Sequence, residues 1–405
     1  MTEDTETFPD GFVWGTATAA HQIEGGNWNN DWWAWEHAPA SPCAEPSGDA
    51  CDSWNRWEDD VALVADVGLG SYRFSVEWSR IEPEDGEWSY AAVDHYRRQC
   101  EALLARGIEP TVTFHHFTTP RWLAVGQQGW EDPATADRFA AFCGRLAGEL
   151  GGDLVRRACT INEPNIVATI GWLLGAFPPG KTDHDLRLRV NDVFVDAHRK
   201  AVDAIRAAAP GVPVGLTLSM TDYQAVEGGE QRRDRMRLEM EDVFLDATEG
   251  DDFLGVQTYS RMRIGPKGML GPEDGVPVLP MGYEYWPEAL EACLRRAWDY
   301  TGGRVPLLVT ENGIGTADDD QRVAYVRGAL EGVLGCLADG IDVRGYTYWS
   351  LLDNFEWAFG YRPRFGLVAV DRETFTRTPK PSAAWYAAVA RSNALVAQPS
   401  PGGRR

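Results

Sequence analysis

The chain has 405 residues, 44% of them hydrophobic, which suffices for one large barrel or for two or three domains of average size. Asp and Glu number 61 against 38 Lys and Arg, and the resulting net charge of −23 argues against nucleic acid or an anionic membrane as a partner. Because the sequence has no Pro/Ser-rich linker and no repeat of fixed period, we expect one domain over residues 1–405, with its core at about 8–390.

Eight short runs of apolar or β-branched residues are predicted to be strands: 11–16, 71–77, 109–115, 157–161, 213–219, 253–259, 306–310 and 344–349. The segments between them carry apolar residues at helical spacing, as in 57–67, 91–105, 135–150, 190–209, 287–300 and 322–337. Strands that alternate with helices are parallel, and eight such units predict an α/β fold with a single (β/α)8 TIM barrel. The open doubly wound sheet is the alternative, and we reject it because no Gly-rich phosphate loop follows the first strand.

Polar and aromatic residues collect at the carboxyl ends of these strands, where barrels place their active sites. In chain order they are Gln22 and Glu24, Glu77 and Trp78, His115 and His116, Asn162 and Glu163, Tyr259, Glu311, and Trp349. Because polar groups are costly inside a buried strand, we expect these side chains to converge on one mouth of the barrel.

Two motifs place a glutamate beside an asparagine at a strand end: Thr160-Ile161-Asn162-Glu163-Pro164 and Val309-Thr310-Glu311-Asn312-Gly313. Hydrolysis of a glycosidic bond needs one carboxylic acid that donates a proton and a second carboxylate. Either motif alone occurs by chance in a long chain. Together, at the ends of two strands, they favour a glycosidase that works with two carboxylates.

Four further motifs accompany these two in order along the chain: Phe8-Pro9-Asp10-Gly11-Phe12-Val13-Trp14-Gly15-Thr16-Ala17-Thr18 with Gln22-Ile23-Glu24-Gly25, Tyr72-Arg73-Phe74-Ser75 with Trp78-Ser79-Arg80-Ile81, His116-Phe117-Thr118-Thr119-Pro120, and Trp349-Ser350-Leu351-Leu352-Asp353-Asn354-Phe355-Glu356-Trp357. From Phe8 to about Tyr386 the chain resembles the family 1 glycoside hydrolases, retaining (β/α)8 enzymes of the β-glucosidase and β-galactosidase type. The resemblance implies one catalytic domain that hydrolyses a small-molecule or oligosaccharide β-glycoside through a covalent glycosyl-enzyme, with no cofactor.

When the functional residues of the family are matched one by one to positions in this chain, the resemblance implies that Glu163 is the acid/base and Glu311 the nucleophile. Negative charge on Glu311 is then expected to raise the pKa of Glu163. Arg73 and Tyr259 correspond to the residues that bond the nucleophile, and Asn162 to the residue that binds the sugar 2-hydroxyl. Sugar recognition falls to Gln22, His116, Asn162, Trp349, Glu356 and Trp357.

Two residues narrow the substrate that the resemblance implies. Family members that hydrolyse 6-phosphorylated glycosides lack the acid at Glu356, because a carboxylate there repels phosphate. The thioglucosidase branch has glutamine where this chain has Glu163. We therefore expect an unphosphorylated O-glycoside, with β-glucosidase activity foremost and β-galactosidase or β-fucosidase activity also compatible.

The chain departs from the family pattern at three places. The family's His-Trp-Asp-Leu-Pro reads His116-Phe117-Thr118-Thr119-Pro120 here, and His115 makes the alignment ambiguous by one residue, although the proline register favours His116. Two residues before Tyr259, this chain has Gln257 where the family has asparagine. We expect this difference to alter a contact to the sugar or to its leaving group. The segment 27–36 is unusually rich in tryptophan and is a candidate for the leaving-group side.

Two other functions stay open at this point. A transglycosidase would use the same site, with an acceptor hydroxyl in place of water. A carbohydrate-binding pseudoenzyme is disfavoured because such proteins have usually lost one glutamate, and both are present here. The sequence leaves open which sugar is preferred and whether the chain forms a homo-oligomer.

Seven cysteines, an odd number in a long chain, do not indicate a disulfide framework, and His and Cys do not cluster at zinc spacing. We therefore predict no metal site. The sequence shows neither a signal peptide nor an apolar stretch long enough to span a membrane, so we expect a cytoplasmic protein.

The acidic surplus generates a prediction about salt. Only Lys181, Lys200, Lys267 and Lys380 are lysines, which a GC-rich genome would explain, but codon usage does not explain the excess of acid. We therefore favour adaptation to a high-salt cytoplasm, as in halophiles, where counterions screen the repulsion among surface carboxylates. The melting temperature is expected to rise steeply between low and molar KCl in a thermal unfolding series. A flat melting temperature across that range would contradict the adaptation.

Overall fold

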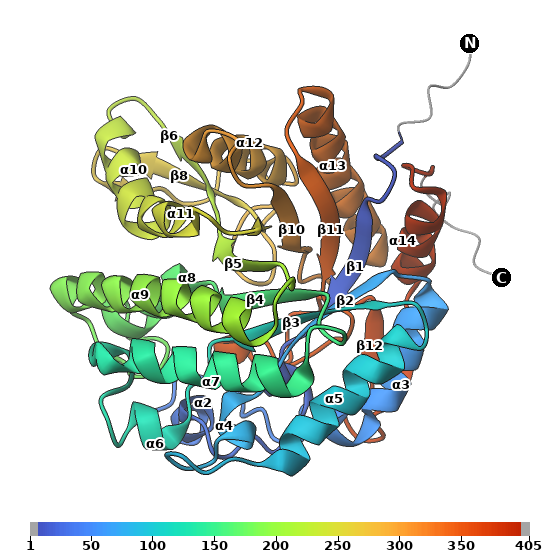
Figure 1. The fold of residues 1–405 in the computed structure, drawn as a ribbon. Coiled ribbons are helices and arrows are strands. Elements are labelled where there is room, and N and C mark those ends of the chain that lie inside the picture. Colours follow the sequence, from blue (N-terminus) through green and yellow to red (C-terminus); the bar gives the residue numbers. More distant parts are fainter. Residues whose placement is uncertain (1–6, 398–405) are drawn as a thin grey trace.

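The computed structural model describes residues 7–397, and its centre is a closed barrel of eight parallel strands (Figure 1). The strands are β1 (Val13–Ala17), β2 (Ser71–Ser75), β3 (Glu109–His115), β4 (Arg157–Asn162), β5 (Val214–Ser219), β7 (Phe253–Gln257), β10 (Leu307–Asn312) and β11 (Val343–Trp349). Each strand pairs with its neighbours along the chain, and β11 closes the barrel on β1. Nearly all their residues are buried, as parallel strands covered on both faces require. The predicted (β/α)8 barrel is confirmed.

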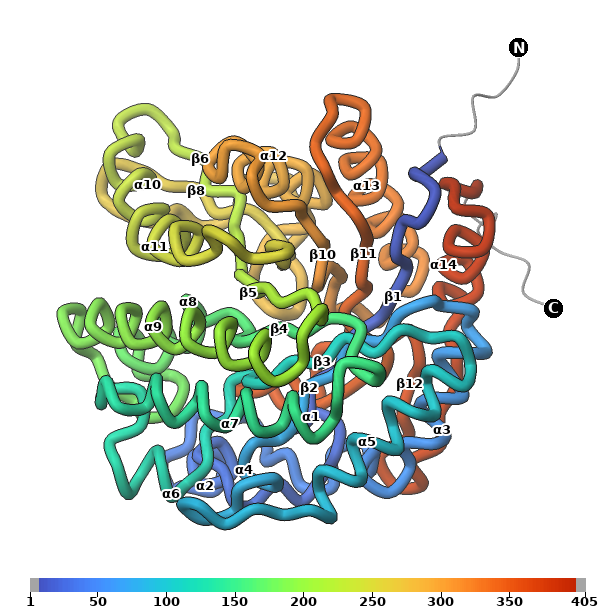
Figure 2. Tube along the Cα trace, viewed as in Figure 1, coloured from blue at the N-terminus to red at the C-terminus, as the bar shows by residue number. Residues whose placement is uncertain are grey.

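The long helices lie around the outside of this barrel, and their course is traced in Figure 2. They are α3 (Ser53–Val67), α5 (Tyr90–Leu104), α7 (Ala134–Leu150), α9 (His184–Ala208), α12 (Ala289–Thr301), α13 (Asp319–Ala338) and α14 (Pro381–Ser392). Helix α9 begins six residues before the predicted start at residue 190. Its start is set by a cap rather than by apolar spacing, because the Asp183 side chain accepts a hydrogen bond from the Leu186 backbone N–H at 2.9 Å.

Several short helical segments lie in the connections. They are α1 (Ala20–Ile23), α2 (Asp31–Glu36), α4 (Trp78–Ile81), α6 (Arg121–Ala124), η1 (Gly129–Glu131), α8 (Pro164–Ala168), η2 (Thr169–Leu173), α10 (Glu230–Arg237), η3 (Leu238–Asp242), α11 (Val243–Leu245), η4 (Asp246–Thr248) and η5 (Trp357–Phe359). Most follow the carboxyl ends of barrel strands, so they build the walls around that mouth of the barrel.

Three barrel strands end two residues away from the predicted end, and this decides where the polar residues near those ends lie. Strands β2 and β7 each end two residues early, at Ser75 and Gln257, so Tyr259 lies in the loop after β7. Strand β10 continues through Glu311 to Asn312, because Asn312 still pairs with Tyr348 of β11 after a shift in register.

Two small sheets outside the barrel were not predicted. Strands β6 (Asp222–Ala225), β8 (Arg261–Gly265) and β9 (Gly268–Met269) form one, and β12 (Val368–Val370) with β13 (Arg377–Pro379) forms the other. These strands have five residues or fewer, too few for alternation of apolar and polar residues to stand out.

All seven cysteines are free, and six of them are buried side chains. Within residues 7–397, no helix combines the length and the apolar character needed to cross a membrane.

Candidate active site

A cavity of about 350 Å³ opens at the carboxyl ends of the barrel strands. Eight of the ten predicted site residues line it: Gln22, His116, Glu163, Tyr259, Glu311, Trp349, Glu356 and Trp357. The other two, Arg73 and Asn162, lie directly beneath it and contact residues of its wall. The barrel therefore brings together side chains that are up to 335 positions apart (357 − 22).

Glu311, on β10, is held at both carboxylate oxygens. Arg73 Nη1 donates to its Oε1 at 2.7 Å, and the Tyr259 hydroxyl donates to its Oε2 at 2.5 Å. Burial raises the pKa of Glu311, and the Arg73 charge and the Tyr259 hydrogen bond lower it. The net shift of the Glu311 pKa is upward, so these two donors offset only part of the effect of burial, and they fix the direction in which the carboxylate oxygens point.

Glu163 follows β4 immediately, and it has a left-handed backbone conformation, with φ 46° and ψ 57°. Its N–H donates to the Thr217 carbonyl of β5 at 2.9 Å, and Pro164 starts α8 directly after it. Left-handed backbone is unusual for a non-glycine residue, and here it turns the side chain into the cavity.

The carboxyl group of Glu163 has a different environment from that of Glu311. Its Oε1 is buried and has no hydrogen-bond partner among residues 7–397. Burial first, and then the negative charge of Glu311, raise the pKa of Glu163 well above the ordinary carboxyl value. Of the two carboxyl groups of Glu163 and Glu311, that of Glu163 therefore holds a proton more strongly.

Asn162 precedes Glu163 and is fully buried. Its Oδ1 accepts hydrogen bonds from Arg73 Nη2 at 2.5 Å and from Gln257 Nε2 at 2.9 Å. Its Nδ2 donates to His116 Nε2 at 3.3 Å. The same arginine thus contacts both Asn162 and Glu311, on strands at different points of the barrel.

Gln22 and Glu356 form a second polar pair in the wall. Gln22 Nε2 donates to the Phe355 carbonyl at 2.7 Å and lies 3.3 Å from Glu356 Oε2. Burial raises the pKa of Glu356 to about 8, with a further contribution from the Glu311 charge. A carboxyl group and an amide are thus placed side by side, facing the cavity.

Aromatic rings line the same wall. The imidazole of His116 is nearly parallel to the Trp349 ring, with centroids 5.8 Å apart, and to the Trp357 ring, at 6.3 Å. Trp32, on α2, packs behind Trp357 with centroids 4.5 Å apart. Flat aromatic surfaces therefore lie next to the polar groups of the cavity wall.

Besides Asn162, which lies beneath the cavity, four strand-end residues that were expected to converge on this mouth do not line the cavity. His115 packs into the helical layer, 5.1 Å from the Trp130 ring, so of the two histidines only His116 faces the cavity. Glu24 accepts hydrogen bonds from Arg80 and Tyr96, Glu77 accepts them from Ser79 and Thr118, and Trp78 stacks on Phe142. The polar atoms of Glu24, Glu77 and Trp78 are satisfied by neighbouring loops and helices, whereas Nδ1 of His115 has no hydrogen-bond partner among residues 7–397.

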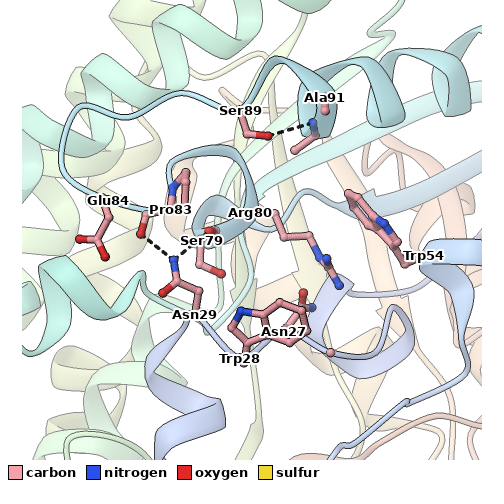
Figure 3. A pocket seen from close by; sticks show the side chains of 12 residues that line it. Asn27, Trp28, Asn29, Trp54, Ser79, Arg80, Pro83, Glu84, Ser89 and Ala91 are labelled. Atoms are coloured by element: carbon pink, nitrogen blue, oxygen red, sulfur yellow. Dashed lines mark hydrogen bonds between the residues drawn. The ribbon is translucent and has the colours of Figure 1, made fainter.

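The tryptophan-rich segment 27–36 contributes no residue to the lining of this cavity. Trp28 is 65% exposed and lines a separate cavity of about 510 Å³, shown in Figure 3 with Arg80 and Trp54. In that cavity the Arg80 guanidinium lies 4.0 Å from the Trp54 ring centroid. The segment instead forms α2, whose Trp32 supports Trp357 from behind.

The apolar part of the cavity wall was missed by sequence reasoning. Most of it comes from loops and short helices: Phe117, Ile166, Ile170, Phe177, Met220, Met281, Phe359 and Phe365, with Met262 added by β8. Apolar residues in loops carry no periodic signal, so nothing in the sequence marked them as lining. Within residues 7–397, no three His, Cys, Asp or Glu side chains are grouped so as to hold a metal ion.

Comparison with known proteins decides the family. The model of glycosyl hydrolase family 1 matches residues 4–253 and 252–395. The chain belongs to this family. It is 32% identical to beta-glucosidase A of Thermotoga maritima over 447 residues (97% of this chain and 99% of the relative), and 36% identical to thermostable beta-glucosidase B of Thermobispora bispora over 444 residues (96% and 92%). The crystal structure of beta-glycosidase BGL167 is 47% identical, covers 98% of this chain and 100% of its own, and superposes with a TM-score of 0.89.

Family membership and the cavity agree. With these relatives across nearly the full length, the chain is a glycosidase. The sequence motifs that resemble this family lie at the strand ends around this cavity.

The raised pKa of Glu356 makes a prediction about stability. Between the ordinary carboxyl pKa of 4.5 and about 8, the folded protein keeps a proton that the unfolded chain has released. Wild-type stability therefore falls as the pH rises through this interval, whereas E356Q has no such proton to lose. The melting temperature of E356Q relative to wild type is expected to increase from pH 5 to about pH 8 and to level off above it. Parallel melting curves at all pH values would show that Glu356 is not protonated in the folded state.

Proposed function

We propose that this glycosidase is a retaining enzyme that hydrolyses unphosphorylated β-D-glycosides, with β-glucosidase activity foremost and β-galactosidase or β-fucosidase activity also compatible. The observation that carries this proposal is the contrast between two carboxyl groups in one cavity. Arg73 and Tyr259 bond the Glu311 carboxylate and offset part of the rise in pKa that burial causes, whereas the pKa of Glu163 is raised more strongly. This is the division between nucleophile and acid that a double displacement needs.

In the first step, Glu311 is the nucleophile and Glu163 the acid. A carboxylate oxygen of Glu311 forms a bond to the anomeric carbon as the glycosidic C–O bond breaks. The departing oxygen takes the proton of Glu163, so the aglycone leaves as a neutral alcohol or phenol. The products of the step are a glycosyl ester on Glu311 and an ionised Glu163.

In the second step, Glu163 changes its role because the charge beside it has changed. Once Glu311 is an ester, it no longer carries the negative charge that raises the pKa of Glu163. Glu163 is then a suitable base for water, which attacks the anomeric carbon and releases Glu311 as a carboxylate. Two inversions return the original β configuration.

The remaining residues are assigned to the sugar. Asn162 turns its Nδ2 toward His116 of the cavity wall and is proposed to donate to the 2-hydroxyl, a contact that strengthens in the oxocarbenium-like transition state. Gln22, His116 and Glu356 supply hydrogen-bonding groups, and Trp349 and Trp357 supply flat apolar surface. Glu356 is an acid at the position where the resemblance implies that enzymes for 6-phosphorylated glycosides have none, which supports a plain glycoside.

Other expectations stay predictions: one catalytic domain with its core at about 8–390, a cytoplasmic location and adaptation to high salt. Transglycosylation would start from the same glycosyl ester, with an acceptor hydroxyl in place of water.

The role of Glu311 is tested by removing its carboxylate. E311G is expected to lose turnover of a nitrophenyl β-glucoside by a factor of about 10⁴ or more, because the acid alone cannot complete the displacement. Azide or formate should restore turnover and give a product with inverted, α configuration, which NMR of the sugar product identifies. Rescue with retained configuration would place the nucleophile at another residue.

The role of Glu163 is tested by varying the leaving group. A 2,4-dinitrophenolate leaves without a proton, whereas an alkoxide needs one. E163A is therefore expected to lose roughly 10²–10⁴-fold in kcat/KM for an alkyl glucoside, and far less in the glycosylation step for the dinitrophenyl glucoside, measured as the pre-steady-state burst. Equal losses for both substrates would remove Glu163 from the acid role.

A further inference from the structure

Gln257, the last residue of β7, is completely buried and lies beneath the cavity rather than in its lining. At this position the resemblance to the family implies an asparagine. Its side chain reaches past β5 to β4, because the order of these strands around the barrel is β4, β5, β7. There its Nε2 lies 2.9 Å from Asn162 Oδ1.

The chemistry of the neighbours fixes which way both amides face. A guanidinium offers only donors, so the Asn162 atom that lies 2.5 Å from Arg73 Nη2 must be the amide oxygen. Gln257 must then present its NH2 group to that oxygen, because two amide oxygens in contact would repel. Its own Oε1 faces the other way and has no hydrogen-bond partner among residues 7–397.

Gln257 and Thr217 are the two neutral side chains that can donate to Asn162 Oδ1, and Gln257 is the better donor of the two. Thr217 Oγ1 lies 3.2 Å from Asn162 Oδ1, but it also lies 3.3 Å from the Ile161 carbonyl. A hydroxyl has a single proton to share between these two acceptors. Gln257 is closer to the Asn162 oxygen and has a hydrogen for it alone.

With its oxygen held from one side, Asn162 turns its NH2 group to the other side, toward His116 and the cavity. We propose that Gln257 is a positioning residue that fixes the amide of Asn162 so that its NH2 group meets the sugar 2-hydroxyl. This inference rests on the proposed function, in which Asn162 makes that contact. Asparagine at position 257 would be one carbon–carbon bond shorter and would not reach Asn162 in the same way.

The test compares two substrates that differ only at the 2-hydroxyl: 4-nitrophenyl β-D-glucoside and its 2-deoxy analogue. The quantity measured is the ratio of their kcat/KM values. Q257M removes the donor at nearly constant volume and is expected to lower this ratio roughly 3- to 10-fold, which corresponds to one ordinary hydrogen bond. Turnover of the 2-deoxy substrate is expected to stay close to wild type, because it has no hydroxyl for Asn162 to meet. A purely structural role would lower both values together.

Two other variants complete the experiment. Gln99, a buried glutamine of α5 outside the barrel, gives the matched control Q99M, in which the ratio should not change. N162A tests the proposed contact itself and should lower the ratio by roughly 10² or more. If N162A lowers the ratio and Q257M does not, the inference about Gln257 is wrong and the proposed contact stands. If N162A does not lower the ratio, the proposed contact of Asn162 is wrong. Should Q257M fail to fold, Q257N replaces it, and an unchanged ratio there would equally overturn the inference.

Discussion

The guanidinium of Arg73 is the interaction on which the site depends. Arg73 lies on β2 and is 2% exposed, yet its nitrogens reach four other strands of the barrel. Nε donates to Thr113 of β3 at 3.1 Å, Nη1 to Glu311 of β10 at 2.7 Å, and Nη2 to Asn162 of β4 and, at 3.4 Å, to Thr217 of β5. An unpaired charge at this depth would be very costly, so the arginine and Glu311 require each other. Arg73 therefore fixes both the positions and the charge balance of the residues beneath the cavity.

This arginine also explains why two glutamates in one cavity behave differently. Both are buried, and burial raises the pKa of each. Only Glu311 has a cation and a phenol hydroxyl in contact to offset that cost, whereas Glu163 has the charge of Glu311 as its neighbour instead. The difference follows from where the strands end, because Glu311 lies inside β10, near Arg73 of β2, and Glu163 lies in the turn that leaves β4. Backbone position thus determines which of the two carboxyl groups has the more strongly raised pKa.

The barrel could be predicted because its strands are buried on both faces and read as apolar runs, and the site because polar residues interrupt those runs at one end. Other parts had no such signal. The walls formed by Phe117, Phe177 and Met281 depend on how loops fold over the mouth, which local sequence does not determine. Residue type alone also failed to separate His115 from His116, since one residue of register decides which faces the cavity and which faces the helices. The tryptophans of 27–36 show the same limit, because their composition suits a binding surface but Trp32 packs behind one.

The charges on the surface and the charges beneath the cavity are subject to different physical constraints. The net charge of −23 is carried largely by exposed carboxylates, whose mutual repulsion acts through water and is screened within about 10 Å at 0.1 M salt. The contact between Arg73 and Glu311 is buried and 2.7 Å long, so dissolved ions cannot come between the two groups. Salt can therefore change the stability of the whole chain while leaving the local charge balance of the cavity nearly the same. For this reason the surface can be strongly acidic without changing the interactions of Glu311 with Arg73 and Tyr259 in the cavity.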